Sequence, residues 1–312
     1  MYLAYRFEVG TAQRNRKDNH MYNEILKIGS ITIYGYGLMI GIGILVAIFT
    51  GAYRAKKHSL SDDHVYGIAI TGLIFGFICA RLTFVAVEPE IFINDPILLI
   101  SGSGFVVYGG IIGGVLAALI YCKIKKIGFL EYFDICIPSV ALAQGFGRIG
   151  CFLAGCCYGC PTDSFIGITF FHSELAPNGV KLVPTQLIMS AGDFIIALVL
   201  ILYYRKKPAK GRTGWLYLIL YSVGRFCVEF LRADYRGSVG PFSTSQFISL
   251  FIFALGAVMF FFGHKLIKQR PAAAEDAETS EAAKAVEEAA EADDSAKEIP
   301  EKPDNAEASD EE

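Results

Sequence analysis

Seven long apolar segments dominate this sequence and constrain its fold more than any other feature. A helix needs about 20 consecutive apolar residues to cross the hydrocarbon core of a bilayer. None of the segments alternates apolar and polar residues as a strand would, and only helices or closed barrels can span hydrocarbon. We therefore predict an all-α integral membrane protein with seven transmembrane helices. These helices are expected near 31–53, 65–87, 104–122, 132–153, 186–204, 214–231 and 245–264.

Charge is distributed very unevenly along the chain. Residues 271–312 hold 16 of the 31 acidic residues and 3 of the 28 basic ones, so the first 270 residues carry a net charge of +10. The chain is 53% apolar and 19% charged, whereas a soluble domain usually has about 25% charged residues. A soluble α/β enzyme, a secreted disulfide scaffold and a nucleic-acid-binding protein are therefore poor fits. The Ala- and Glu-rich segment 271–312 is typical of disordered tails.

The basic residues of the predicted loops lie on one side of the membrane. The loops after the first, third, fifth and seventh segments are rich in Lys and Arg, whereas 88–103, 155–185 and 232–244 contain few. Cytoplasmic loops of membrane proteins carry the excess of Lys and Arg. We therefore predict that the N-terminus is outside and the C-terminus is in the cytoplasm.

The first 20 residues do not fit this orientation. Residues 1–20 would place four basic side chains outside, and they lack the apolar stretch of a signal peptide. Our hypothesis is that translation begins at Met21, so that 1–20 is a non-native or disordered extension. The predicted domains are this extension, a seven-helix membrane domain at 21–270 and the cytoplasmic tail 271–312.

Polar residues within the apolar segments mark a candidate site. A charged side chain at the centre of a membrane helix costs about 2.5–3.5 kcal/mol on insertion scales, so such residues are usually functional. The predicted topology places polar groups from five segments in one layer near the outer leaflet. They are Tyr34, Tyr36, Arg81, Tyr108, Gln144, Arg148, Arg225, Glu229 and Arg232.

Arg225, Glu229 and Arg232 are spaced i, i+4 and i+7, so they share one helix face. One interpretation is an Arg225–Glu229 ion pair with Arg232 extended to the lipid headgroups. The other is an anion site, because the guanidinium fork matches phosphate. With one buried carboxylate among the arginines, positive charge would remain for an anionic headgroup.

Glycines accompany two of these polar positions. The glycines of 108–114 are typical of close helix packing. Those of 145–150 flank Arg148, where they would let a ligand or a neighbouring backbone approach the guanidinium, or let the helix kink.

Four of the eight cysteines cluster at the outer end of the fourth segment, namely Cys151, Cys156, Cys157 and Cys160. We expect a disulfide or plain packing first, and a thiol base or nucleophile activated by Arg148 second. A metal site comes third, because C-x4-C-C-x2-C lacks a second spaced CxxC pair or a nearby His.

Six blocks resemble, in order and spacing, the bacterial phosphatidylglycerol–prolipoprotein diacylglyceryl transferase family. They are TIYGYGLM (32–39), CARL (79–82), VYGGIIGG (107–114), GRIGCFLAGCCYG (147–159), PTQL (184–187) and GRFCVEFLRADYRG (224–237). The resemblance implies an enzyme of the bacterial plasma membrane that moves the diacylglyceryl group of phosphatidylglycerol to the lipobox cysteine of prolipoprotein signal peptides. This is the first step of lipoprotein maturation; glycerol-1-phosphate leaves, and no cofactor or metal is implied.

The resemblance also implies roles for individual residues. Arg148 would hold the lipid phosphate, Arg225 would be a second essential arginine, and Tyr36 and Tyr108 complete the expected catalytic set. Arginines would improve the leaving group, and a nearby base must accept the thiol proton. The other residues expected to bind substrate are Arg232, Glu229, Gly147 and Gly159, together with Gln144 from the outer polar layer.

The sequence departs from the family pattern where acid–base groups are expected. Tyr108 stands where many members have His, Cys151 and Cys156 replace Asn and Glu, and Val183 and Met189 replace His and Glu. Either Tyr108 or a cysteine thiolate then serves as the base, or the chain is a lipid-binding relative with lost or altered activity whose cysteines do redox or metal work. An anion transporter fits least, because no internal repeat is visible and the charge lies near one face.

Overall fold

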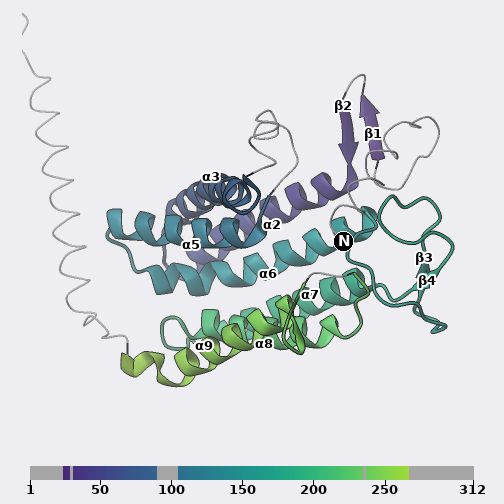
Figure 1. The fold of residues 1–312 in the computed structure, drawn as a ribbon. Coiled ribbons are helices and arrows are strands. Elements are labelled where there is room, and N and C mark those ends of the chain that lie inside the picture. Colours follow the sequence, from purple (N-terminus) through teal and green to yellow (C-terminus); the bar gives the residue numbers. More distant parts are fainter. Residues whose placement is uncertain (1–23, 29–30, 90–104, 235–236, 267–312) are drawn as a thin grey trace, which may run out of the picture. The chain divides into compact units, whose positions relative to one another are not determined.

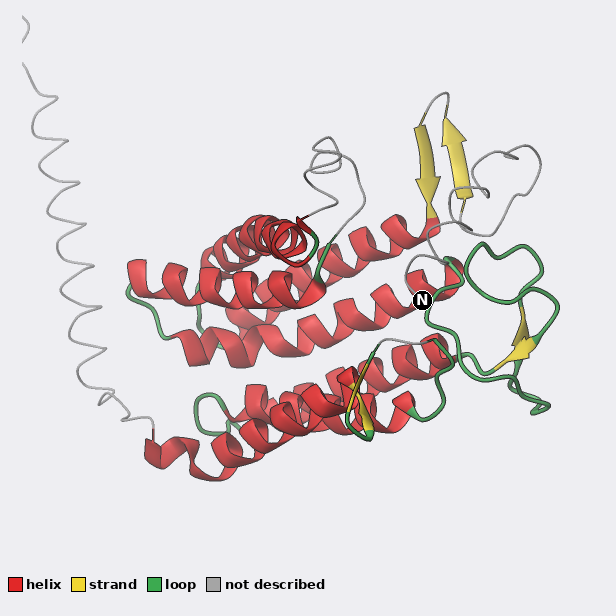
Figure 2. Ribbon diagram, in the orientation of Figure 1, coloured by secondary structure: helices red, strands yellow, loops and turns green. Residues whose placement is uncertain are grey.

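Seven long helices run through the described part of the computed structural model, which covers residues 24–28, 31–89, 105–234 and 237–266 (Figures 1 and 2). The helices are α2 (Gly35–Lys57), α3 (Asp62–Val87), α5 (Val107–Ile124), α6 (Phe129–Leu153), α7 (Thr185–Tyr204), α8 (Arg212–Glu229) and α9 (Thr244–Leu266). Three short antiparallel hairpins accompany them. They pair β1 (Glu24–Ile28) with β2 (Ile31–Tyr34), β3 (Ile168–Thr169) with β4 (Lys181–Leu182), and β5 (Ser238–Val239) with β6 (Phe242–Ser243).

Each predicted apolar segment falls on one of these helices, with ends that differ by a few residues. The largest difference is at 31–34, predicted as helix, which pairs as strand β2 with β1. The β-branched residues Ile31, Thr32 and Ile33 favour this extended conformation. The start at Met21 and the predicted domain boundaries at 20 and 270 lie outside the described residues.

Six helices of the described chain are long and apolar enough to cross a membrane: α2, α3, α5, α6, α7 and residues 244–263 of α9. The remaining helix, α8, is 18 residues long but carries Arg212, Arg225 and Glu229. Large apolar side chains such as Phe49, Phe77 and Ile120 are exposed along the helices. Extended apolar surface of this kind suits contact with lipid, so the chain is a multi-pass membrane protein.

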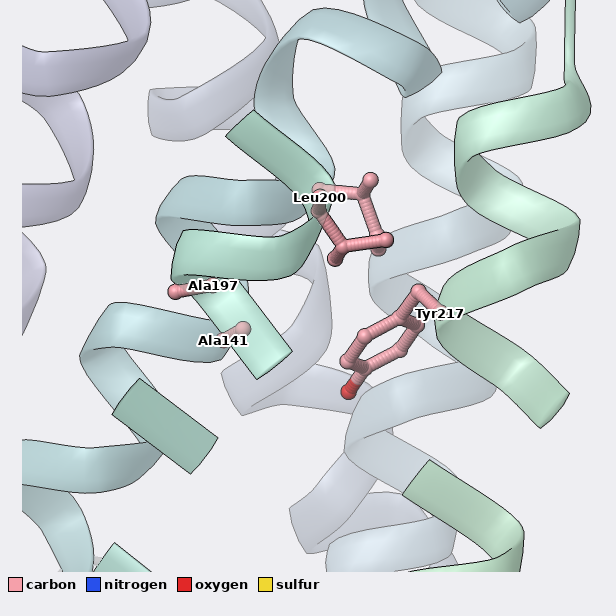
Figure 3. Close-up of a cluster of buried hydrophobic side chains, with 5 residues drawn as sticks. Ala141, Ala197, Leu200 and Tyr217 are labelled. Atoms are coloured by element: carbon pink, nitrogen blue, oxygen red, sulfur yellow. The ribbon is translucent and has the colours of Figure 1, made fainter. Parts of the chain in front are cut away.

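Helix α6 lies between α2 and α7 and packs extensively against both, while α3 pairs with α5 and α8 with α7 (Figure 1). Small residues bring α6 and α7 close together, and Tyr217 of α8 packs against them. Ala141 and Ala197 are fully buried and pack with Leu200 and Tyr217 (Figure 3). Close approach at small residues is a main source of helix association in lipid, where no hydrophobic driving force operates between helices.

The glycines of 108–114 pack α5 against α3. A Cβ atom at Gly109 would overlap the side chain of Thr83, and one at Gly113 would overlap Cys79. The packing role predicted for these glycines is therefore confirmed at both positions.

Buried polar contacts align the helices at the end that carries the basic last turn of α2 and the basic connections 125–128 and 205–211. Arg54 donates to the carbonyl of Ile135 at 2.8 Å, which ties α2 to α6. The carboxylate of Asp134 accepts from the backbone N–H of Gly211 at 2.6 Å and thereby holds the start of α8. Because consecutive helices alternate in direction, their other ends meet at the opposite end of the bundle.

Candidate active site

The predicted site residues gather at the end of the bundle opposite the basic connections. Tyr36 lies in the first turn of α2, Gln144 and Arg148 lie near the end of α6, and Arg225 and Glu229 lie near the end of α8. The structure thus brings polar groups from three helices together at one end.

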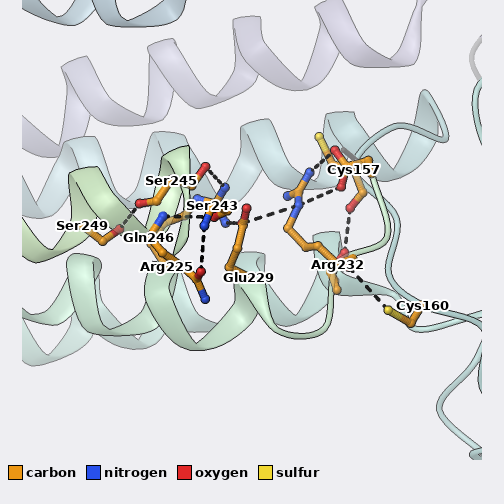
Figure 4. A network of polar contacts seen from close by, with 11 residues as sticks. Cys157, Cys160, Arg225, Glu229, Arg232, Ser243, Ser245, Gln246 and Ser249 are labelled. Atoms are coloured by element: carbon orange, nitrogen blue, oxygen red, sulfur yellow. Dashed lines mark hydrogen bonds and ion pairs between the residues drawn. The ribbon is translucent and has the colours of Figure 1, made fainter. Parts of the chain in front are cut away.

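Arg225, Glu229 and Arg232 form a connected polar network (Figure 4). Arg225 makes an ion pair with Glu229 and donates to Ser245 Oγ of α9 at 2.7 Å. Arg232 donates to Asp234 from Nε at 2.9 Å and from Nη2 at 2.6 Å. The predicted Arg225–Glu229 pair is confirmed, but Arg232 does not extend to the headgroups: its side chain is 2% exposed.

The expectation of a single buried carboxylate near the arginines is wrong. Asp193 of α7 is 4% exposed, and Asp234 lies against Arg232. Together with Glu229, these groups balance much of the positive charge that the sequence suggested would be left for an anion. A lone acidic residue within the apolar segment 186–204 was the signal that could have identified Asp193.

Arg148 differs from the other two arginines, because within the described residues it makes no hydrogen bond or ion pair. Its charge interacts with the ring hydroxyl of Tyr221, the thiols of Cys151 and Cys157, and Asp193. The side chain is partly buried, near Asp193 of α7 and Tyr221 of α8. Arg148 therefore keeps guanidinium donors for a ligand, in the planar fork geometry that suits phosphate.

Three cysteine thiols meet beside Arg148. The sulfur atoms of Cys151, Cys156 and Cys157 all lie within 4.8 Å of one another. Cys160 is separate, with its sulfur 3.4 Å from the carbonyl oxygen of Arg232. All eight cysteines are among the described residues, and no disulfide joins any of them, so of the two first expectations, a disulfide or plain packing, the disulfide is not formed.

The environment of Cys156 does not favour a thiolate. Hydrogen bonds with the thiols of Cys151 and Cys157, together with burial, raise the pKa of Cys156 well above its usual value. A thiol that keeps its proton near neutral pH is a poor base and a poor nucleophile. The geometry therefore gives no support to Cys156 alone as the proton acceptor.

Comparison with known proteins identifies the family. A family model described as prolipoprotein diacylglyceryl transferase matches residues 23–262. The chain belongs to this family. A phosphatidylglycerol–prolipoprotein diacylglyceryl transferase of Clostridium tetani is 48% identical over 76% of this chain and 95% of its own length. Enzymes of Clostridium perfringens and Staphylococcus haemolyticus are 46% and 32% identical, over 75% and 83% of this chain and 92% and 93% of their own lengths.

The two tyrosines expected in the catalytic set of this diacylglyceryl transferase family member have different surroundings. Tyr36 lies near Arg148 and near the thiols of Cys151 and Cys156. Tyr108 is half-exposed at the first turn of α5, whose main partner is α3. None of the polar contacts described above involves Tyr108, so the geometry favours Tyr36 as part of the same cluster.

Two of the three glycines that flank Arg148 serve packing. A Cβ at Gly145 would press against the ring of Phe194, and one at Gly150 would lie 3.2 Å from Tyr36. Gly147 alone of these three faces open space, with nothing within 4 Å of an added Cβ. Of these three glycines, only Gly147 has open space beside its Cα.

Gly159 allows two backbone segments to meet. An added Cβ would lie 2.6 Å from the carbonyl oxygen of Val183 and 2.7 Å from that of Leu231. Its N–H donates to Val183 at 3.0 Å, and it bridges to Arg232 in antiparallel fashion. Gly159 thus supports the loop after α6 and, through it, the position of Arg232.

Gln144 has a positioning role in the described structure. Its side-chain oxygen accepts from the hydroxyl of Tyr217 at 2.6 Å, which joins α6 to α8.

Sequence reasoning did not single out the residues that complete this region. They are Asp193, Tyr217, Tyr221, Asp234 and Ser245.

A cavity of about 500 Å³ lies at the other end of the bundle. It is lined by residues at the basic ends of the helices, including Lys57, Glu131, Asp134 and Lys207. It contains none of the predicted site residues.

Proposed function

We propose that this protein transfers the diacylglyceryl group of phosphatidylglycerol to the cysteine thiol of prolipoproteins, the reaction named for its relatives. The observation that carries the proposal is the guanidinium of Arg148. It lies beside a polar cluster, and its N–H donors form no hydrogen bond or ion pair within the described residues. The anionic phosphate diester of phosphatidylglycerol would be the hydrogen-bonded partner that Arg148 lacks among the described residues.

The proposed reaction exchanges a carbon–oxygen bond for a carbon–sulfur bond. The acceptor sulfur attacks the glyceryl carbon of the lipid, the bond from that carbon to the phosphate oxygen breaks, and glycerol-1-phosphate leaves with the electron pair. Arg148 would bind the phosphate oxygens and stabilise the negative charge that develops on them. The thiol proton must pass to an acceptor as the sulfur attacks.

Arg225 and Arg232 have supporting roles in this proposal. Both are engaged by carboxylates, Arg225 with Glu229 and Arg232 with Asp234. They would hold the end of α8 and the loop after α6 in place, and they would add a positive field around the phosphate. Tyr36, which lies near Arg148 and the thiols of Cys151 and Cys156, would line the site.

We further propose seven membrane spans, an outside N-terminus and a cytoplasmic C-terminus in the plasma membrane. The basic connections at one end of the bundle support this orientation, because such residues are retained in the cytoplasm. The lipobox thiol of a secreted protein would then arrive at the end that carries Arg148. Helix α8 would span as part of the bundle, with its charged residues facing the other helices.

The decisive experiment is the intact mass of a lipobox peptide incubated with phosphatidylglycerol and the full-length protein in detergent. A gain of one diacylglyceryl group on the cysteine supports the transfer reaction. The matched control is a peptide in which that cysteine is serine, which should gain nothing.

A lipid-binding relative without transfer activity is the second candidate, and the cysteines at the positions of the family's Asn and Glu favour it. It predicts bound phosphatidylglycerol with no mass gain on the peptide. That result would contradict the proposed reaction while retaining the lipid site at Arg148.

A further inference from the structure

The three thiols at the end of α6 have the spacing of a metal site. The sulfur atoms of Cys151, Cys156 and Cys157 lie within 4.8 Å of one another. Zinc–sulfur bonds of about 2.3 Å in tetrahedral geometry place ligand sulfurs about 3.8 Å apart. A small inward shift of the side chains would therefore bring all three sulfurs onto one ion.

The loop that carries two of these thiols is anchored on buried side chains. Gly155 and Cys157 have positive φ angles of 69° and 64°, which turn the chain back toward the end of α6. Thr185 Oγ1 donates to the carbonyl of Cys157 at 2.6 Å, and Gln186 Nε2 donates to that of Cys156 at 2.7 Å. Because Thr185 and Gln186 are fully buried, the loop is held on a rigid support, as a metal site requires.

The charges around the cluster suit a thiolate–metal complex. Three thiolates and one divalent ion carry a net charge of −1. Arg148 interacts with the thiols of Cys151 and Cys157, and Arg232 is hydrogen-bonded to Cys157. These guanidinium groups would stabilise that anionic complex, and thiolate ligands select soft or borderline ions of the zinc type.

Within the described residues, no fourth His, Cys, Asp or Glu joins the three thiols in this group. Cys160, the remaining cysteine of the signature, has its sulfur directed at the carbonyl of Arg232 and is outside the group. Zinc sites that act on substrates have three protein ligands and keep the fourth position for water or substrate. Coordination to such an ion ionises a thiol.

We propose that Cys151, Cys156 and Cys157 bind one zinc-type ion whose fourth ligand is the acceptor cysteine of the substrate. This metal site rests on the proposed function. It explains how the acceptor thiol would be ionised in a chain in which the family's acid–base residues are replaced. As the metal–sulfur bond forms, the thiol proton passes to water. The sulfur then uses a lone pair to form the carbon–sulfur bond while glycerol phosphate leaves with the electrons of the broken carbon–oxygen bond.

The first test measures the metal directly. The full-length protein in detergent is loaded with zinc, or with cobalt as a spectroscopic substitute, and the metal-to-protein ratio is determined by mass spectrometry. We expect one ion per chain with cobalt–thiolate absorption, and at least a tenfold loss of affinity in Cys156→Ser. Cys227→Ser, which changes an exposed cysteine of α8, is the matched control and should bind normally. A metal-free protein with reactive thiols, or with a disulfide among these three cysteines, would overturn the proposal.

The second test examines the open position. A lipobox peptide added to the cobalt-loaded protein should raise the cobalt–thiolate absorption by about a third, because a fourth thiolate joins three, and the serine peptide should leave it unchanged. No increase would overturn the acceptor-ligand part of the proposal. A bound ion with a coordinated peptide but no mass gain with phosphatidylglycerol would instead contradict the transfer reaction and support the metal site.

Discussion

At the scale of single residues, the three arginines of the site are distinguished by their partners. Arg225 and Arg232 each have a carboxylate, whereas Arg148 has none in hydrogen-bonding contact among the described residues. A guanidinium that already forms a bidentate pair with Asp234 has fewer donors for a ligand than one that forms none. Arg148 is therefore the residue whose replacement should affect the lipid phosphate most directly.

Arg148→Ala should reduce diacylglyceryl transfer at least a hundredfold, because removal of a charge-stabilising donor commonly costs that much in rate. Arg148→Lys should recover only part of the activity, since an ammonium lacks the planar fork. Initial rates of peptide mass gain measure both. Transfer at the normal rate by Arg148→Ala would contradict the phosphate-binding role.

Asp234→Asn should destabilise the protein rather than act on the chemistry alone. Arg232 would lose its hydrogen-bonded carboxylate while remaining almost fully buried, with Glu229 left at 3.9 Å, and a buried charge deprived of a close partner costs about 2–3 kcal/mol or more. Thermal unfolding in detergent should show a lower midpoint than for Asp163→Asn, which alters an exposed loop carboxylate. Equal midpoints for the two variants would mean that the Arg232–Asp234 pair contributes little to stability.

At the scale of elements, close approach of helix backbones holds the bundle together. Helices α3 and α5 meet where Gly109 and Gly113 face Thr83 and Cys79. Helices α6 and α7 meet at Gly145, whose carbonyl accepts from Ser190 Oγ at 2.9 Å. Such contacts are short because no side chain separates the backbones.

Gly113→Ala should separate α5 from α3, because the added methyl group overlaps the side chain of Cys79. Overpacking of this kind usually costs about 1–3 kcal/mol. Gly41→Ala on α2 is the matched control, since nothing lies within 4 Å of its added Cβ. Unfolding by denaturing detergent compares the two; similar stability would show that α3 and α5 can adjust at no cost.

At the scale of the whole molecule, the alternating helices separate two chemically different ends. One end carries the basic connections 125–128 and 205–211, and the other carries Arg148 and the thiol cluster of Cys151, Cys156 and Cys157. An enzyme that acts on a secreted substrate from a membrane lipid needs this separation: in the proposed orientation the positive loops stay in the cytoplasm and the site faces outward.

A membrane-impermeant thiol reagent should test that orientation in intact cells, in a background with the native cysteines replaced. Asp163→Cys, in the loop between α6 and α7, should be labelled from outside. Lys206→Cys, in the connection between α7 and α8, should be labelled only after the membrane is opened. The reverse pattern would contradict the proposed topology.

Local features of the sequence predicted the helices and part of the polar network. Each apolar segment became a helix because the length and composition that suit a bilayer are properties of a contiguous stretch. The Arg225–Glu229 pair was predictable for the same reason, since residues four apart on a helix are neighbours. Strand β2 was not predicted, because its four residues, Ile31–Tyr34, directly precede the first apolar helix. In the sequence they cannot be told from the start of that helix.

Only the tertiary structure decided which polar groups share the site. Asp193 approaches Arg148 because α7 packs on α6, and Asp234 reaches Arg232 because the chain turns after α8. The three thiols meet because Gly155 and the backbone of Cys157 reverse the chain against α7. The composition of a segment determines whether it enters the membrane, but the contacts between helices and loops determine which of its side chains become neighbours.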